Sequence, residues 1–124
     1  MVKDDIRITV KAEFLAQHSN SAKHRFAFAY TITIANYGQR SAQLLSRSWK
    51  IKDANNKIQV VEGLGVVGEQ PRIAPGGAYT YTSSAIIETE IGTMEGYYLM
   101  QCEDGDTFQA AIPTFVLAPA HAIH

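Results

Sequence analysis

The chain has 124 residues, of which 46% are hydrophobic and 19% are charged, and its formal net charge is −1. A chain of this length is expected to form one domain, residues 1–124, and it is too apolar to remain disordered. The near-neutral balance excludes a broadly basic nucleic-acid-binding protein, and the lack of a run of about 18 apolar residues excludes a membrane span, so we expect neither nucleic acid nor a membrane as a partner.

The start of the sequence and its cysteine content predict a cytoplasmic protein. Lys3, Asp4, Asp5 and Arg7 interrupt the first ten residues, so no secretory signal peptide can be assigned there. Cys102 is the single cysteine. It therefore excludes an intrachain disulfide and a cysteine-based zinc site, which is typical of a reducing compartment.

Apolar and polar residues alternate with a period of two along most of the chain, which predicts strands. The first strand runs from Ile6 to Phe14. The second covers residues 26–34, and because only small Ala and Thr residues separate its large apolar ones, we expect a central strand that is covered on both faces. A third strand over residues 42–52 contains Trp49, and the turn residues 53–56 lead into a fourth over residues 57–62, which together predict a hairpin.

Three more strands are predicted in the second half. Pro75-Gly76-Gly77 precedes a strand over residues 78–84, and Asp104-Gly105 joins strands over residues 95–102 and 106–112 in a hairpin. Pro113 has no amide to donate, so we expect it on a sheet edge or at a bulge. No window shows a helical stripe, and the chain is predicted to be all-β: an immunoglobulin/fibronectin type III-like sandwich of about seven antiparallel strands in two sheets.

The charges are unevenly distributed along the chain. All eleven Lys and Arg residues lie at or before Arg72, whereas six of the twelve acidic residues follow it. This split would give a dipolar surface if the two halves formed separate faces. We expect mixing instead, because strands from both halves of a sandwich interleave.

A G-x-G-x-x-G pattern is formed by Gly63, Gly65 and Gly68. In a dinucleotide-binding fold this pattern opens a helix whose amides hold pyrophosphate, but here Pro71 and a second glycine turn follow, and no helix is predicted. Two interpretations stay open. The loop binds phosphate through inward-pointing amides with help from Arg72, or the glycines only permit a tight crossover between sheets, which we favour.

Arg47 and Trp49 are two residues apart and therefore lie on one face of the predicted strand. They would form a flat platform for a partner peptide or a base if that face were exposed. The alternative, which we favour, is that the indole belongs to the core and that the guanidinium reaches an edge.

No catalytic arrangement is apparent, and we expect a protein that is not an enzyme and has neither a cofactor nor a bound metal. Cys102 precedes two acidic residues, which disfavour its thiolate, and no motif for nucleophilic or metal-dependent hydrolysis is present. The acidic run over residues 103–106 lacks calcium-loop spacing and is interpreted as a hairpin turn.

Several spaced motifs together resemble the ApaG domain family. They are YTITIAN (30–36), QLLSRSWKIKD (43–53), EGLGVVGEQP (62–71), YTYTS (79–83), GTMEGYY (92–98) and IPTF (112–115). The resemblance implies a fibronectin type III-like sandwich. It also implies a link to cobalt resistance, magnesium efflux and diadenosine tetraphosphate metabolism, with Gly63, Gly65 and Gly68 as a candidate pyrophosphate site, while related eukaryotic domains act as protein-interaction modules.

We therefore predict a non-enzymatic interaction module that presents a sheet edge or the 63–72 loop to a protein partner. Because edge strands pair readily with a second chain, a homodimer is an alternative form of that contact. The alternative function is a small-anion receptor that binds pyrophosphate or a dinucleoside polyphosphate at Gly63, Gly65, Gly68 and Arg72.

Overall fold

The alternating pattern of the sequence becomes eight β-strands in the structure, a computed structural model that describes residues 5–122. The strands are β1 (Ile6–Phe14), β2 (Phe26–Asn36), β3 (Ala42–Asp53), β4 (Ile58–Leu64), β5 (Arg72–Ile73), β6 (Ala78–Ile87), β7 (Gly92–Cys102) and β8 (Thr107–Leu117). Three 3₁₀ turns complete the described elements: η1 (Ala16–His18), η2 (Ser21–Lys23) and η3 (Ala120–Ala122). The seven predicted strands are present, and β5 is the additional one.

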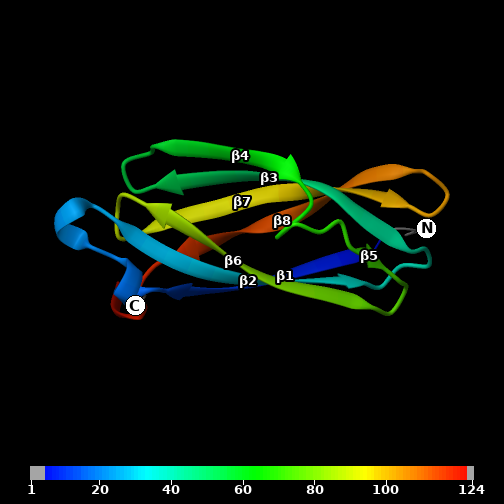
Figure 1. Cartoon of the computed structure of the whole chain (residues 1–124), viewed down its shortest axis with the longest axis horizontal. Coiled ribbons are helices and arrows are strands. Elements are labelled where there is room, and N and C mark those ends of the chain that lie inside the picture. Colours follow the sequence, from blue (N-terminus) through cyan, green and yellow to red (C-terminus); the bar gives the residue numbers. More distant parts are fainter. Residues whose placement is uncertain (1–4, 123–124) are drawn as a thin grey trace.

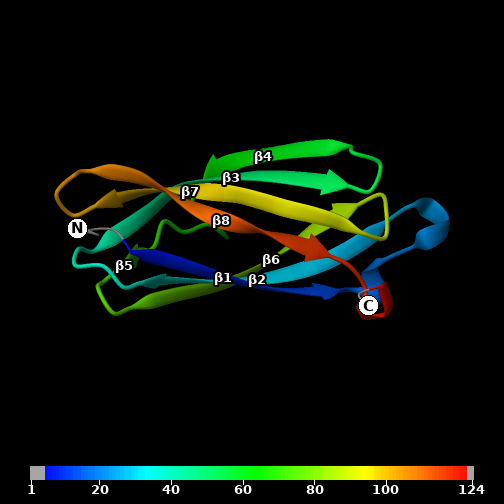
Figure 2. The ribbon, with the colours of Figure 1, turned by 180° about the vertical axis from the view of Figure 1, so that it is seen from behind.

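The strands form two antiparallel sheets that pack face to face (Figure 1). One sheet has the order β1-β2-β6, and the other has the order β4-β3-β7-β8, with β5 also paired to β3. This arrangement confirms the predicted all-β sandwich. Strands β1 and β8 lie next to each other on one side, as the view from behind shows (Figure 2), whereas β4 and β6 are the outer strands on the other side.

The core lies between the two sheets and is formed by the alternate residues that the period-two pattern points inward. Phe28, Tyr30, Ile32 and Ile34 of β2 are buried. The predicted position of β2 at the centre of a sheet is confirmed, but the residues between them are only partly buried, and the prediction that β2 is covered on both faces was wrong. The outer face of β2 instead carries threonines whose hydroxyls bond to threonines of β6, at 2.9 and 3.0 Å.

Two β-bulges change which residues face the core. In β3 the register against β7 shifts between Leu44 and Ser46, so Leu45 is an extra residue. Even-numbered residues point inward before the bulge and odd-numbered ones after it, which turns Arg47 and Trp49 toward the interior.

The second bulge contains Pro113. In β8, Pro113 and Thr114 together lie opposite Glu95 of β7. Because β8 is also the last strand of its sheet, Pro113 lies both on an edge and at a bulge, as its missing amide predicts.

The turns confirm the predicted hairpins. After β3, Asn56 has a φ of +64°, and the Asp53 carboxylate accepts hydrogen bonds from the amides of Asn55 and Lys57 at 2.8 and 2.9 Å. The acidic residues 103–106 form the turn between β7 and β8, with Gly105 at a φ of +95°.

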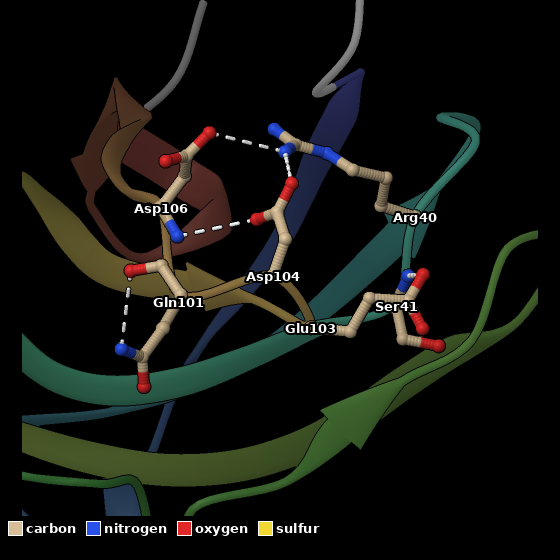
Figure 3. Close-up of polar contacts among 7 residues, drawn as sticks. Arg40, Ser41, Gln101, Glu103, Asp104 and Asp106 are labelled. Atoms are coloured by element: carbon tan, nitrogen blue, oxygen red, sulfur yellow. Dashed lines mark hydrogen bonds and ion pairs between the residues drawn. The ribbon is translucent and has the colours of Figure 1, made fainter.

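Ion pairs connect the basic first half of the chain to the acidic second half. The Arg40 guanidinium bonds to Asp104 and, at 3.2 Å, to Asp106 across the space between two loops (Figure 3). Lys57 pairs with Glu88 at 2.8 Å. These contacts support the expectation that interleaved strands mix the charges.

In residues 5–122, no helix is long and apolar enough to cross a membrane.

Candidate functional site

The glycine-rich segment leaves the sheet and returns to it beside the Leu45 bulge. Gly63 lies within β4, and the chain leaves the sheet at Gly65, which has a φ of +64°. Residues 66–69 then form a tight two-residue turn, with Val67 at a φ of +43° and Gly68 at +82°. The segment rejoins β3 where the Leu44 amide donates to the Pro71 carbonyl at 2.9 Å.

Three amides of this segment already have partners within the protein. The Gly65 amide donates to the Leu45 carbonyl at 2.9 Å, and the amides of Val66 and Glu69 each donate to the other residue's carbonyl, at 2.8 and 2.9 Å. In residues 5–122, no α-helix follows the glycines. The pattern therefore lacks the helix dipole that holds pyrophosphate in a dinucleotide-binding fold, and in residues 5–122 only the Val67 and Gly68 amides at the tip of the turn have no hydrogen-bond partner within the segment 65–69.

Two of the glycines are required by close contacts. A Cβ on Gly65 would lie 2.2 Å from the carbonyl oxygen of Glu69. A Cβ on Gly63 would lie 3.0 Å from Nη1 of Arg47, so the missing side chain makes room for the guanidinium. The geometry thus gives these two positions a structural reason to be glycine.

Arg47, rather than Arg72, is the arginine at the glycine-rich segment. Its Nη1 donates to the carbonyls of Leu64 and Gly65, at 3.0 and 2.9 Å. Arg72 lies in β5, where it is exposed and donates to the Gln43 side chain at 3.3 Å. Sequence distance suggested Arg72, and the register of β3 against β4, which pairs Arg47 with Gly63, brings Arg47 there instead.

Trp49 is a core residue. Its exposed fraction is 2%, and its ring meets Tyr30 edge to face with centroids 5.4 Å apart. Arg47 and Trp49 do share one face, as predicted, but that face is the inner one. An exposed platform formed by the two side chains is therefore excluded, because the indole is covered by the opposite sheet.

A groove opens between the outer strands β4 and β6, on the side of the sandwich away from β1 and β8. Its wider part has a volume of about 390 Å³, and a second part of about 290 Å³ continues toward the glycine-rich segment. Both parts are lined by Tyr30, Arg47, Trp49 and Ser83. No acidic residue lines either part, so within the described chain Arg47 is the only charged group of the groove.

Three buried or half-buried tyrosines lie near this arginine. The hydroxyls of Tyr81 and Tyr98 bond to each other, and both rings are buried. Burial raises the pKa of Tyr81 and of Tyr98 far above the usual range, and the bond to Tyr81 adds to the rise for Tyr98. Burial also raises the pKa of Tyr30, which a hydrogen bond to Ser83 and the nearby Arg47 partly offset. All three phenols are therefore neutral at physiological pH.

Strand β4 exposes an unusual number of apolar side chains for an edge strand. Val60 and Leu64 have exposed fractions of 65% and 78%. With Ile58, Val61 and Val67, they account for five of the nine exposed large hydrophobic residues in the described chain. We call residues 58–67 the β4 edge. Natural edge strands usually carry lysine, proline or a bulge that prevents pairing, and β4 contains none of these.

The fold and this edge define a small β-sandwich domain, and comparisons with known proteins identify its family. Residues 16–102 match the family model of the ApaG domain. The chain is 49% identical over 122 residues to "Protein ApaG" of Thiobacillus denitrificans, covering 98% of this chain and 96% of the relative. It is 50% identical to "Protein ApaG" of Dechloromonas aromatica over 119 residues, with 96% and 94% covered.

A crystal structure of a Bordetella pertussis protein, described as ApaA, superposes with a TM-score of 0.92 at 40% identity, covering 95% of this chain and 96% of that one. The chain belongs to the ApaG domain family. The resemblance that the spaced motifs indicated is thereby confirmed.

Sequence reasoning missed two features of the site. The inward direction of Arg47 depends on the Leu45 bulge, and alternation of residue types does not reveal where an extra residue is inserted. The apolar character of the β4 edge is visible in the sequence, because Ile58, Val60 and Val61 are accompanied by the single charge of Glu62. The sequence does not show that this strand is an edge strand, because that depends on the order of the strands in the sheet.

Proposed function

We propose that this ApaG domain is a non-enzymatic interaction module whose β4 edge receives an extended segment of a protein partner. The observation that carries the proposal is the concentration of exposed apolar side chains on a strand that, among the described strands, has only one neighbour, β3. Strand addition would satisfy the unpaired backbone groups of β4 and would cover Val60 and Leu64. The implied link to cobalt and magnesium homeostasis would then depend on which protein this partner is.

The alternative function, a receptor for pyrophosphate or a dinucleoside polyphosphate at the glycine-rich segment, is less favoured. The amides of Gly65, Val66 and Glu69 are already bonded within the protein, and Arg72 pairs with Gln43. A phosphate ligand that carries two to four negative charges normally requires several free hydrogen-bond donors or cations at one place.

The test uses a photoreactive amino acid at position 60, with position 116 on β8 as the matched control, because Val116 is also an exposed valine on an edge strand. Crosslinking in cells should give one discrete protein adduct from position 60 and none from position 116. The affinity of the identified partner should then fall at least about tenfold in Val60→Lys and in Leu64→Lys, equivalent to about 1.4 kcal/mol, and should be unchanged in Val116→Lys.

Other results would change the assignment. An adduct with a second copy of the chain would make the β4 edge a homodimer contact. Equal adducts from both positions would contradict a specific surface. Saturable amide shifts confined to residues 63–69 on titration with diadenosine tetraphosphate, pyrophosphate and Mg²⁺ would support the anion receptor instead.

A further inference from the structure

We propose that the groove between β4 and β6 is a carboxylate-binding site in which the Arg47 guanidinium pairs with the anionic group. The inference adds a ligand chemistry to the proposed interaction surface, but it does not depend on strand addition to β4. A carboxylate on a small organic acid and one at the end of a peptide share this chemistry.

The groove contains an uncompensated positive charge. After the Leu45 bulge, the register of β3 points Arg47 toward the space between the sheets, and the missing side chain of Gly63 leaves room for its guanidinium. Its hydrogen-bond partners are two carbonyl oxygens, those of Leu64 and Gly65, and among the described residues it forms no ion pair. A partly buried cation loses hydration, and a carboxylate partner is the usual means of recovering that energy.

Part of the Arg47 guanidinium remains available for a ligand. Nη1 is engaged with the two carbonyls, whereas Nε and Nη2 have no hydrogen-bond partner in residues 5–122. Arginine offers a planar fork that matches the two oxygens of a carboxylate. The wall of the groove opposite β4 carries the Ser83 hydroxyl, and the Tyr30 side chain lies beside it.

The buried tyrosine pair also has a hydroxyl proton to donate. Tyr81 and Tyr98 share one hydrogen bond, which uses one of their two hydroxyl protons. Tyr81 lines the smaller part of the groove, so when Tyr98 is the donor of the shared bond, the Tyr81 hydroxyl proton is a donor for an acceptor that enters there. An anion is such an acceptor, and a second cation is not.

The charge of the groove favours a carboxylate over a phosphate. One guanidinium balances a single negative charge, and the neighbouring amides of Gly65 and Val66 are already bonded. Polar and apolar side chains both line the wider part of the groove, with Gln59 and Ser84 beside Val61 and Ile86, which suits an acid that carries a small apolar body.

The test is an amide NMR titration of the full chain with 3-phenylpropionate, alongside its neutral amide, inorganic phosphate, and the peptide acetyl-Val-Thr-Val with a free or an amidated C-terminus. We expect saturable chemical-shift changes at Tyr30, at the Trp49 indole and at Ser83. The acid should bind at least tenfold more tightly than its neutral amide and than phosphate. A preference for the free-ended peptide over the small acid assigns a partner segment as the source. The reverse preference assigns a metabolite.

Variants separate charge from architecture. Arg47→Gln should abolish binding, and Arg72→Gln, which removes an arginine outside the groove, should leave it unchanged. Arg47→Gln also removes the hydrogen bonds to Leu64 and Gly65, so a second pair of variants is needed. Val61 lines the groove two residues from Gly63. Val61→Glu places a carboxylate there and should block the site, whereas Val61→Gln should not.

Val60→Lys tests independence from the proposed function, since it should prevent strand addition and leave carboxylate binding intact. Equal affinity for acid and amide, tighter binding of phosphate, or unchanged binding in Arg47→Gln or Val61→Glu would each overturn the inference.

Discussion

Gly65 combines a positive φ with a close backbone contact, and Gly68 has only the first of these features. A Cβ on Gly65 would meet the Glu69 carbonyl at 2.2 Å, whereas nothing lies within 4 Å of one on Gly68. Gly68→Ala should therefore lower the free energy of unfolding by about 1 kcal/mol, for its backbone conformation alone. Gly65→Ala should lower it by about 3 kcal/mol or more, because the turn must also move.

Urea denaturation of the two variants beside the parent chain measures this difference. Equal losses of unfolding free energy in the two variants would mean that the turn moves to accommodate a side chain at residue 65 without additional cost. The same comparison bears on the glycine pattern as a whole, since a purely architectural role predicts that stability, rather than any ligand affinity, responds to these substitutions.

At the scale of elements, Asn36 joins the end of β2 to its neighbours. Its exposed fraction is 1%, and its Nδ2 donates to the carbonyls of Arg40 and Ile73 at 2.8 and 3.0 Å. Its Oδ1 accepts from the Gly38 amide at 2.9 Å. Asn36→Ala should lower the free energy of unfolding by about 3 kcal/mol, because backbone groups of a turn and of β5 lose their partner.

Asn55→Ala is the matched control, because Asn55 is exposed in a turn and no hydrogen bond from its side chain is found among the described residues. Thermal unfolding followed by circular dichroism gives the comparison. A loss at Asn36 no greater than at Asn55 would show that β5 contributes little to the sandwich.

The elements also show how far the sequence alone leads. Period-two alternation located the long strands correctly because burial on one face is a local property of residue order. It could not reveal β5, which has two residues and exists because the chain returns to β3 beside Leu44. It also missed the Leu45 bulge, and with it the direction of Arg47. The candidate site was therefore only half predictable: the glycine-rich segment could be found, but not its arginine.

At the scale of the whole molecule, the tyrosines of the core predict alkaline unfolding. Burial raises the pKa of Tyr81 and Tyr98 above the ordinary value of about 10. The unfolded chain ionises these phenols near pH 10 and the folded chain does not. Their contribution to stability is therefore complete below that pH and is lost as the pH rises beyond it.

Urea denaturation between pH 8 and 11 should show this decline, and tyrosinate absorbance from the buried pair should appear together with unfolding. Tyr98→Phe removes one of the two phenols and should make the decline less steep. A stability that stays constant to pH 11 in the parent chain would contradict the buried, neutral pair.

The pairing of strands from both halves has a consequence for how the chain reaches its native state. Strand β2 needs β6, and β3 needs β7, and each of these partners lies far along the chain. The pairs β1–β2, β3–β4 and β7–β8 join consecutive strands, and only the last two are joined by short turns. Domains dominated by such distant pairings fold in milliseconds to seconds rather than microseconds. During synthesis, neither sheet can be completed until its late strands emerge, and until then β2 and β3 each expose an unpaired edge in addition to the β4 edge, which stays exposed in the finished fold.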